Sequence, residues 1–473
     1  MKTLDYGELQ RLAKVRGCRI TDLIALAPQN DPFYCGMPAA REKAEWFAAL
    51  WHDLGLDGAR GVHLRRVHYR INAQREPLPL PAPVTWKDKD TKVEYSTTVY
   101  ENSERCWEVL GEASKAARYL RLVDPDAFVD RRNPDPHVYF APRAVMPAIS
   151  YWIDSPSWKL PSVEVDLSCE LAWPDFDIEG YEYLAGDQPV ICEIWAEKST
   201  MNDVLLPLGR ELGVNVATSL GFQSITNVLS LLRDRARDSG KAARIFYVSD
   251  FDPSGDAMPT AVARQIEYWL PFYSEGADIA LTPVALTRDQ AERYRLPRKP
   301  VKDSDRRKAA FEERHGAGAV ELDALEALYP GELAKIIREA VKPYHDDTLA
   351  DRLDEAYDEA CEAVSQAWEW ESGPYYASLS EIESEARAVV ERYEGELGRI
   401  QDAMEAELEP LRERLENLRQ DISEARDRVR VSLPDRPGPE LGPIDESGWL
   451  YHSKRDYFDQ LEAYKARRNG EDR

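Results

Sequence analysis

Three carboxylates follow two predicted buried strands and together have the chemistry to hold a divalent cation. Glu197 ends the apolar run 190–196, and Asp250 and Asp252 follow the apolar run 244–248. If these strands are parallel, their carboxyl ends open onto the crevice where α/β sheets bind ligands. Residues two apart in an extended chain face the same way, so Asp250 and Asp252 can share one cation. Oxygen ligands of this kind suit Mg²⁺, with Mn²⁺ as a possible substitute.

A purely structural interpretation of the same loop stays open. The segment Asp252-Pro253-Ser254-Gly255 also fits a turn that caps the next helix, because Asp is a favoured N-cap residue. Two further features favour a cation site: Glu197 lies one strand–helix–strand unit upstream, and Gly221 falls in the intervening turn. We also expect no basic partner beside the two aspartates, so that a cation would relieve their repulsion.

The elements that must position these acids alternate between strand and helix. Strands are predicted at 190–196, 215–218, 244–248 and 279–283, and helices at 201–212, 225–236 and 258–270. The strands are predominantly apolar in continuous runs rather than alternately polar and apolar, which is typical of a parallel sheet covered on both faces. The predicted fold class is therefore multidomain α/β and α, with a Rossmann-like parallel α/β domain at 189–345.

The acidic constellation resembles the Toprim domain. Glu197-Lys198, Gly221 and Asp250-x-Asp252-Pro253-Ser254-Gly255 are similar to the version in the A subunit of topoisomerase VI and in the related meiotic double-strand-break transesterase. The resemblance extends to the stand-alone bacterial, plasmid and phage homologues of that subunit. The resemblance continues through 279–282 and 320–325 and spans residues 40 to 345 in outline. It implies magnesium-dependent DNA cleavage, with Glu197, Asp250 and Asp252 as metal ligands and Glu197 alternatively as general acid.

The same family carries a nucleophilic tyrosine, in an Arg-x-x-x-Tyr context, on a winged-helix domain. Residues 64–70, Leu-Arg-Arg-Val-His-Tyr-Arg, are similar. The resemblance therefore makes Tyr69 the candidate nucleophile and Arg65 the residue that neutralises charge on the attacked phosphate. Where the family often has two adjacent tyrosines, this chain has His68-Tyr69.

Helical geometry is compatible with that role for Tyr69. On a helix the buried stripe would be Leu64, Val67 and Ile71. Tyr69 then lies away from the stripe, on one face with Arg65 at i−4. An ordinary tyrosine packed on a basic helix remains the alternative, and we expect His63 and His68 at the surface.

The mechanism implied by the resemblance is phosphoryl transfer without ATP. Tyr69 would attack a DNA phosphate and form a phosphotyrosyl link. In the family, the tyrosine and the metal site come from different protomers, which implies a homodimer that cuts both strands. The chain contains no GxxxxGK[ST] loop, so an ATP site is not expected in it. A separate ATPase or other subunit would have to join from outside.

Charge is distributed unevenly along the chain. The net charge is −25, but residues 351–430 carry 23 acidic and 10 basic side chains, whereas residues 1–150 carry 20 acidic and 22 basic ones. A basic stretch at 293–308 can hold phosphates although the whole chain is acidic. The candidate DNA contacts are Arg66, Arg70, Lys198, Arg298, Lys299, Lys302, Arg306 and Arg307.

The remaining segments complete the predicted organisation. Residues 1–150 are predicted as a helical, winged-helix-like DNA-binding module, with helices at 40–54, 64–73 and 102–120 and a loop or small wing at 77–83. Residues 151–188 are expected as an irregular connector with one strand at 163–167. In residues 346–432, apolar residues spaced by threes and fours predict an acidic coiled-coil arm or helical hairpin, with a first helix ending at Ser372-Gly373-Pro374. Residues 433–473 form a tail with a short helix.

Several classes of protein are disfavoured. No apolar run approaches the roughly 18 residues of a membrane span and the first residues lack a signal-peptide core, so we expect a cytoplasmic, nucleoid-associated protein without a membrane partner. The six cysteines form no CxxC pair, which argues against disulfides and zinc. Two alternatives to the transesterase stay open: a hydrolytic nuclease, in defence or in a mobile element, that does not use Tyr69, and a non-catalytic DNA-binding or assembly protein.

Overall fold

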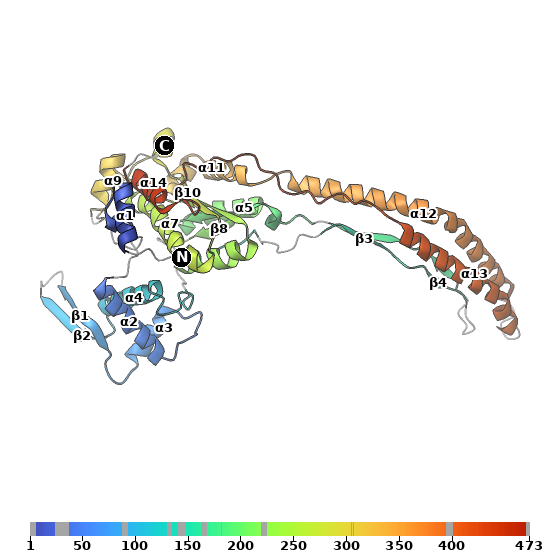
Figure 1. The fold of residues 1–473 in the computed structure, drawn as a ribbon, viewed down its shortest axis with the longest axis horizontal. Coiled ribbons are helices and arrows are strands. Elements are labelled where there is room, and N and C mark those ends of the chain that lie inside the picture. The colour runs from blue at the N-terminus through green and yellow to red at the C-terminus, as the bar shows by residue number, and fades with distance from the viewer. Residues whose placement is uncertain are drawn as a thin grey trace. The chain divides into compact units, whose positions relative to one another are not determined.

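A computed structural model describes residues 6–23, 37–87, 93–129, 135–140, 148–161, 168–180, 182–218, 225–303, 305, 307–393 and 401–469 (Figure 1). The chain divides into two compact units. Unit 1 contains Met1–Ala144, Ala185–His345 and Leu441–Arg473, and unit 2 contains Val145–Leu184 and Asp346–Glu440. The mixed α/β and α architecture that the sequence predicts is present.

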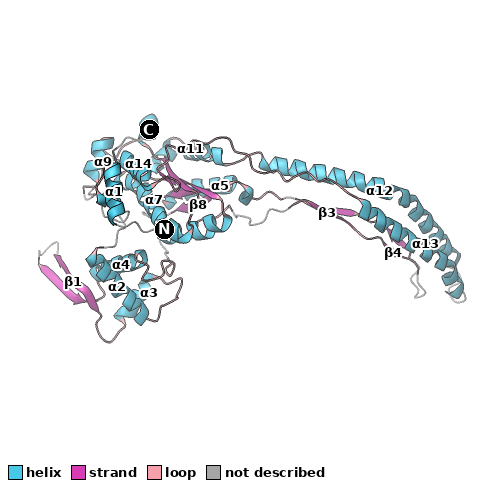
Figure 2. Cartoon of the chain, in the orientation of Figure 1, coloured by secondary structure: helices cyan, strands magenta, loops and turns pink. Residues whose placement is uncertain are grey.

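Unit 1 contains a β-sheet, drawn in magenta among its helices (Figure 2). The sheet has five strands in the order β11-β10-β9-β7-β8. Its strands are β7 (Val190–Ala196), β8 (Asn215–Thr218), β9 (Ala242–Val248), β10 (Ile279–Ala285) and β11 (Tyr451–His452). The pairs β7/β8, β7/β9 and β9/β10 are parallel, as predicted, and β11 is antiparallel to β10.

Two apolar cores lie on opposite faces of this sheet. On one face Ile194 packs in a cluster with Leu205 of α5 (Asn202–Leu212) and Ile337 of α11 (Glu332–Val341). On the other, Trp195 packs with residues of α6 (Ile225–Ser230), η4 (Leu231–Arg237) and α7 (Pro253–Tyr273). Burial on both faces explains why the strands read as continuous apolar runs.

Shorter elements complete the sheet region of unit 1. They are α1 (Tyr6–Arg16), η1 (Ile20–Leu23), η2 (Ala185–Asp187), η3 (Ser199–Met201), α8 (Arg288–Arg293), α9 (Lys308–His315), α10 (Leu322–Leu328), η5 (Lys342–Tyr344) and α14 (Tyr457–Asn469). The short helix expected near the C-terminus is α14.

The segment expected as a tail contributes to the sheet. Ala280 and Leu281 of β10 pair with His452 and Tyr451 of β11. An edge strand presents unpaired backbone groups, and the chain satisfies part of that edge of β10 with its own late segment. Residues 441–469 therefore belong to the compact unit that holds the sheet.

Three helices and a hairpin form the N-terminal lobe of unit 1. The helices are α2 (Pro38–Asp53), α3 (Leu64–Asn72) and α4 (Glu104–Tyr119), and the hairpin is β1 (Pro79–Lys87) with β2 (Glu94–Val99). Phe47, Val67 and Leu110 share one core. The predicted helices are thus present. The proline-rich run enters β1, whose register shifts between Pro79 and Val84, since prolines cannot donate to a regular ladder.

Unit 2 is a helical hairpin of α12 (Leu349–Tyr393) and α13 (Gln401–Arg428). Three ion pairs define an antiparallel register: Arg392–Glu407, Arg414–Glu385 and Arg428–Glu371. From one pair to the next, the residue number on α12 decreases while the residue number on α13 increases, so the two helices run in opposite directions. The two helices thus form an antiparallel hairpin, which is one of the two arrangements expected for the acidic arm.

The prediction that a helix ends at Ser372-Gly373-Pro374 is wrong, because α12 continues through this segment. Trp368 and Leu379, on either side of it, pack into one cluster with Ile422 of α13. This packing holds the helix together across the single hydrogen bond that Pro374 cannot make.

The expected irregular connector contains two antiparallel ribbons in unit 2. One pairs β3 (Ser150–Ile153) with β6 (Phe176–Glu179), and the other pairs β4 (Ser157–Lys159) with β5 (Glu170–Ala172). They pack on the hairpin, for example through Ile178 against Leu353. The strand expected at 163–167 lies outside the described residues. None of the helices in the described ranges has both the length and the apolarity that a bilayer crossing requires.

Candidate functional site

The predicted acids lie where the direction of chain connection in the sheet reverses. Strand β8 is on one side of β7 and β9 is on the other, so the loops after β7 and β9 diverge at their carboxyl ends. Glu197 follows β7, and its N–H donates to the carbonyl of Val248 at the end of β9, at 3.0 Å. Such a switch point is the usual ligand crevice of an open α/β sheet.

Asp252 is the N-cap of α7. Its Oδ1 accepts hydrogen bonds from the N–H groups of Ser254 at 2.9 Å and Gly255 at 2.7 Å. The capping interpretation of this loop is therefore confirmed, and the cap uses the Oδ1 atom of Asp252. A Cβ on Gly255 would lie 2.0 Å from the carbonyl oxygen of Asp250, so only glycine lets the helix start this close to β9. Gly221 lies outside the described residues.

Asp250 is buried, with 5% of its surface exposed, and both of its oxygens have partners. Its Oδ1 accepts from the N–H of Leu322 at 2.8 Å, and its Oδ2 lies 2.5 Å from Nζ of Lys198. The expectation that no basic partner lies beside the aspartates is wrong. Lys198 immediately follows Glu197, and the adjacency of β7 and β9 brings it to Asp250.

Two acids that are not among the predicted site residues lie around the same ammonium. Nζ of Lys198 lies 3.8 Å from Glu321 and 3.9 Å from Asp323. They flank Leu322, whose N–H binds Asp250, and Phe251 pairs with Val320 through a β-bridge. Residues 321–323 have the same acid-x-acid spacing as residues 250–252. This spacing is the sequence signal by which the two additional acids could have been predicted.

Glu197 is electrostatically unusual. Burial, followed by repulsion from Asp250 and Asp252, raises its pKa to about 7. Its Oε2 is buried and has no hydrogen-bond partner among the described residues. Both features would be relieved by a positive charge at this carboxylate.

No three His, Cys, Asp or Glu side chains of the described ranges are arranged as a ready metal site. The donors nevertheless fit a hard cation by their chemistry. They are carboxylate oxygens, one of them buried without a partner, and their mutual repulsion favours added positive charge. Glu197, Asp250 and Asp252 are the residues that would hold it.

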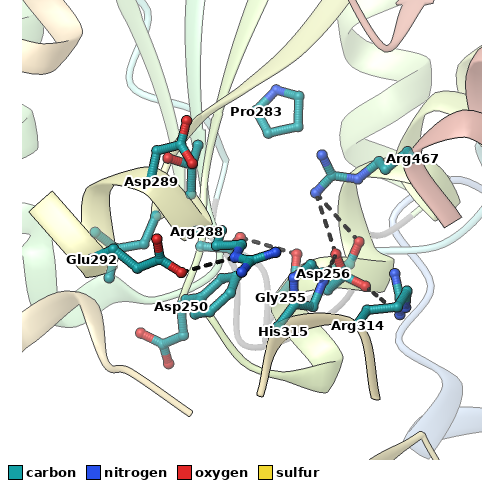
Figure 3. Close-up of a pocket in the computed structure, with 14 residues that line it drawn as sticks. Asp250, Gly255, Asp256, Pro283, Arg288, Asp289, Glu292, Arg314, His315 and Arg467 are labelled. Carbon is teal, nitrogen blue, oxygen red and sulfur yellow. Dashed lines mark hydrogen bonds and ion pairs between the residues drawn. The ribbon is translucent and has the colours of Figure 1, made fainter. Parts of the chain in front are cut away.

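A cavity of about 340 Å³ adjoins Asp250 (Figure 3). On one side of it Asp256 faces two arginines, Arg314 at 2.9 Å and Arg467 at 3.9 Å, and the imidazole of His315 at 3.8 Å. Burial would raise the pKa of Asp256, but these neighbours, led by His315, lower it overall. This cavity was not predictable from local sequence, because its walls come from segments far apart in the chain: the loop after β9, α7, β10 with the loop that follows it, α8, α9 and α14.

The predicted DNA-contacting residues of 293–308 differ in their surroundings. Arg298 donates to the carbonyl of His315 at 2.9 Å, and Lys299 forms an ion pair with Glu321. Arg307 donates to Oγ of Ser254, beside the Asp252 cap, at 2.8 Å. Lys302 is exposed, and Arg306 lies outside the described residues.

Tyr69 is 63% exposed on α3, as expected for a tyrosine away from the buried stripe. It borders a cavity of about 610 Å³. The described residues that line this cavity are His63, Leu64, Arg65, Arg66, Tyr69, Trp107, Ser114, Arg118, Phe128, Val129 and Thr226. Three of them are arginines and none is acidic, so the cavity suits an anion. Arg70 is exposed on the same helix.

The expectation of two surface histidines is wrong for His68. It is buried, and its ring nitrogens lie 2.7 Å from the hydroxyl of Tyr100 and 3.1 Å from Oδ1 of Asn102. His63 accepts a hydrogen bond from the N–H of Arg65 at 3.1 Å and caps α3. Both histidines thus fix the helix that carries Tyr69.

The structure brings together the three acids with Lys198, and separately Tyr69 with Arg65 and Arg66. Among the described residues, no hydrogen bond or ion pair joins the two groups. A scan against protein-family models and a search of curated proteins both find no match for this chain.

Proposed function

We propose that this chain is a divalent-cation-dependent DNA-cleaving enzyme similar to the A subunit of topoisomerase VI, with a Toprim-type metal site. The carrying observation is the convergence of Glu197, Asp250 and Asp252 at the switch point of the parallel sheet. The raised pKa of Glu197, caused first by burial and then by repulsion from Asp250 and Asp252, supports it, because a bound cation would stabilise the charged carboxylate.

The cation would be Mg²⁺ or Mn²⁺, held by Glu197, Asp250 and Asp252. When bound, it would supply Lewis-acid stabilisation of charge on the phosphate and on the leaving oxygen. Glu197 has an alternative role as the acid that protonates the leaving 3′ oxygen, for which a pKa of about 7 is suited.

Tyr69 would be the nucleophile. Its hydroxyl oxygen attacks a DNA phosphorus and loses its proton, the bond from phosphorus to the 3′ oxygen breaks, and a 5′-phosphotyrosyl link and a free 3′ hydroxyl result. Arg65 would neutralise charge on the attacked phosphate. The exposed hydroxyphenyl group beside an arginine-lined cavity supports these roles.

A homodimer follows if the tyrosine of one protomer reaches the acids of the other. No hydrogen bond or ion pair among the described residues joins Tyr69 to the acids of its own chain, which supports this arrangement. The same observation equally supports the second candidate. That candidate is a nuclease in which water replaces Tyr69 as nucleophile. DNA is the partner in both cases, and strand passage would need a separate ATPase subunit.

Covalent trapping tests the proposal. Supercoiled plasmid is incubated with the protein and Mg²⁺ or Mn²⁺, stopped with SDS, and separated with and without proteinase K. We expect linear DNA that enters the gel only after proteolysis, and its loss in Tyr69→Phe and in Asp252→Asn, where Asn preserves the helix cap. Tyr95→Phe, at another exposed tyrosine of the N-terminal lobe, is the matched control.

Each other outcome is informative. Cleavage that survives Tyr69→Phe but not Asp252→Asn would identify the hydrolytic nuclease. DNA binding without cleavage under any condition, unchanged by Asp252→Asn, would favour a non-catalytic assembly protein and contradict the proposal.

A further inference from the structure

Lys198 is surrounded by carboxylates. Its ammonium lies 2.5 Å from Asp250 and within 4 Å of Glu321 and Asp323, and Glu197 is its neighbour in sequence. Lys299, which is also nearby, is paired with Glu321. Lys198 is therefore the cation in direct contact with the buried member of the acidic cluster.

This contact has a physical reason. Asp250 is almost fully buried, and a buried carboxylate without a nearby positive charge is strongly destabilising. One hydrogen bond, from the N–H of Leu322, satisfies Oδ1, and the ammonium satisfies Oδ2. Lys198 thus supplies at Asp250 the compensation that a metal ion would also supply.

Two cations cannot share that oxygen without strong repulsion at a separation of a few ångströms. We propose that Lys198 is the resident cation of the cluster, that a divalent metal ion displaces its ammonium from Asp250, and that the displaced ammonium binds a DNA phosphate. This inference rests on the proposed function, because it takes the acids as metal ligands.

The surroundings of Lys198 allow such an exchange. Its side chain is 30% exposed, whereas that of Asp250 is 5% exposed, so the ammonium has a path to solvent. Glu321 and Asp323 lie at 3.8 and 3.9 Å and can hold the ammonium after it leaves Asp250. Lysine is a compact point charge on a flexible stem, which suits transfer from a carboxylate to a phosphate.

Metal affinity is the first test, with Mn²⁺ as the probe and titration calorimetry as the readout. The full-length chain is compared with Lys198→Met and with Lys299→Met. Lys299→Met is the matched control, because it removes the same charge from a lysine that contacts Glu321 rather than Asp250. Asp252→Asn identifies the heat that belongs to the cluster rather than to other acids of this acidic chain.

We expect Lys198→Met to lower the Kd for Mn²⁺ at least tenfold, and Lys299→Met to lower it less than threefold. Equal effects of the two variants on the Kd would overturn the exchange, because the loss of one positive charge anywhere near the cluster would then explain both. Lys198→Arg keeps the cation and should stay within threefold of the wild-type Kd. If Lys198→Met does not fold, Lys198→Gln carries the same expectation, because its amide can donate to Asp250 without charge.

Thermal unfolding gives a second readout that does not depend on activity. Lys198→Met should melt below the wild type in EDTA, because Asp250 loses its partner, and saturating Mn²⁺ should raise its melting temperature more than that of the wild type. A Mn²⁺-induced shift no larger than the wild-type shift would contradict the proposal.

The transfer to phosphate is tested by the salt dependence of DNA binding, in a Tyr69→Phe background that prevents trapping. With Mn²⁺, Lys198→Met should reduce the slope of log K against log salt by about 0.9, the value of one phosphate contact on duplex DNA. In EDTA the slopes should be equal. A reduction of the same size in EDTA would mean that Lys198 binds DNA without exchange, and no reduction with Mn²⁺ would mean that it does not reach the phosphate.

Failure of this inference can be told from failure of the proposed function. If the wild type shows no Mn²⁺ heat that Asp252→Asn removes, the metal site itself is absent and both fall. If that heat is present and the two lysine variants behave alike, only the exchange falls.

Discussion

The backbone N–H of Glu197 donates to the carbonyl of Val248, and this bond ties the ends of β7 and β9 together. It places the Glu197 carboxylate near Asp250, two residues beyond Val248. The same arrangement explains why the pKa of Glu197 is raised by burial and by both aspartates. The ends of the two strands, and not the loops alone, create the acidic cluster.

The raised pKa predicts how stability depends on pH without metal. Between the ordinary pKa of a glutamate and about 7, the folded protein holds a proton on Glu197 that the unfolded chain releases. Folding stability from this group is therefore present at low pH and is lost as pH rises toward and through 7. Glu197→Gln should remove this decline, which is roughly 1–3 kcal/mol. Urea unfolding in EDTA at pH 5, 6, 7 and 8 measures it, and parallel curves for the two proteins would contradict the assignment.

Gly255 predicts a steric requirement at the acidic loop. Gly255→Ala places a Cβ against the carbonyl of Asp250 and should cost on the order of 1–3 kcal/mol, and it should abolish Mn²⁺ binding by displacing the loop. Gly111→Ala is the control, because it is on α4 with no atom within 4 Å of the new Cβ and should be neutral or stabilising by about 0.5–1 kcal/mol. Chemical unfolding and titration calorimetry measure both, and equal behaviour of the two alanines would refute the steric argument.

Neighbouring residues of α3 should separate stability from activity. His68→Ala removes a buried ring bonded to Tyr100 and Asn102, so it should destabilise the N-terminal lobe by about 1–3 kcal/mol. Tyr69→Phe, at an exposed site, should change stability by less than about 0.5 kcal/mol while eliminating covalent DNA trapping. Unfolding curves of the two variants provide the check, and a large loss of stability in Tyr69→Phe would make its trapping result uninterpretable as chemistry.

The helical hairpin should depend on its seam rather than on its surface ion pairs. Ile422 is fully buried against α12, so Ile422→Ala should cost about 2–5 kcal/mol in this unit. Arg414→Ala removes an exposed pair with Glu385 and should have little effect. Hydrogen exchange should accelerate in α12 and α13 peptides of Ile422→Ala and stay unchanged in the sheet; acceleration in Arg414→Ala instead would contradict the predicted order.

Much of this organisation is determined by local sequence. The continuous apolar runs that became β7 to β10 predict strands buried on both faces, and the alternation with helices predicts their parallel order. The spacing of apolar residues by threes and fours in the acidic segment likewise predicts helix with a continuous apolar stripe, which the structure divides between α12 and α13. Because acids directly after such strands must lie at one edge of the sheet, Glu197, Asp250 and Asp252 were identifiable as a group.

Only the tertiary structure decided the partners of these residues. Lys198 reaches Asp250 because β7 and β9 are adjacent, which strand order fixes and spacing along the chain does not. Packing against α13 carries α12 through Pro374, and contacts with Tyr100 and Asn102 bury His68, against expectations drawn from local propensity. Periodicity reports which face of an element is apolar, whereas the identity of what covers that face depends on residues far away in the sequence.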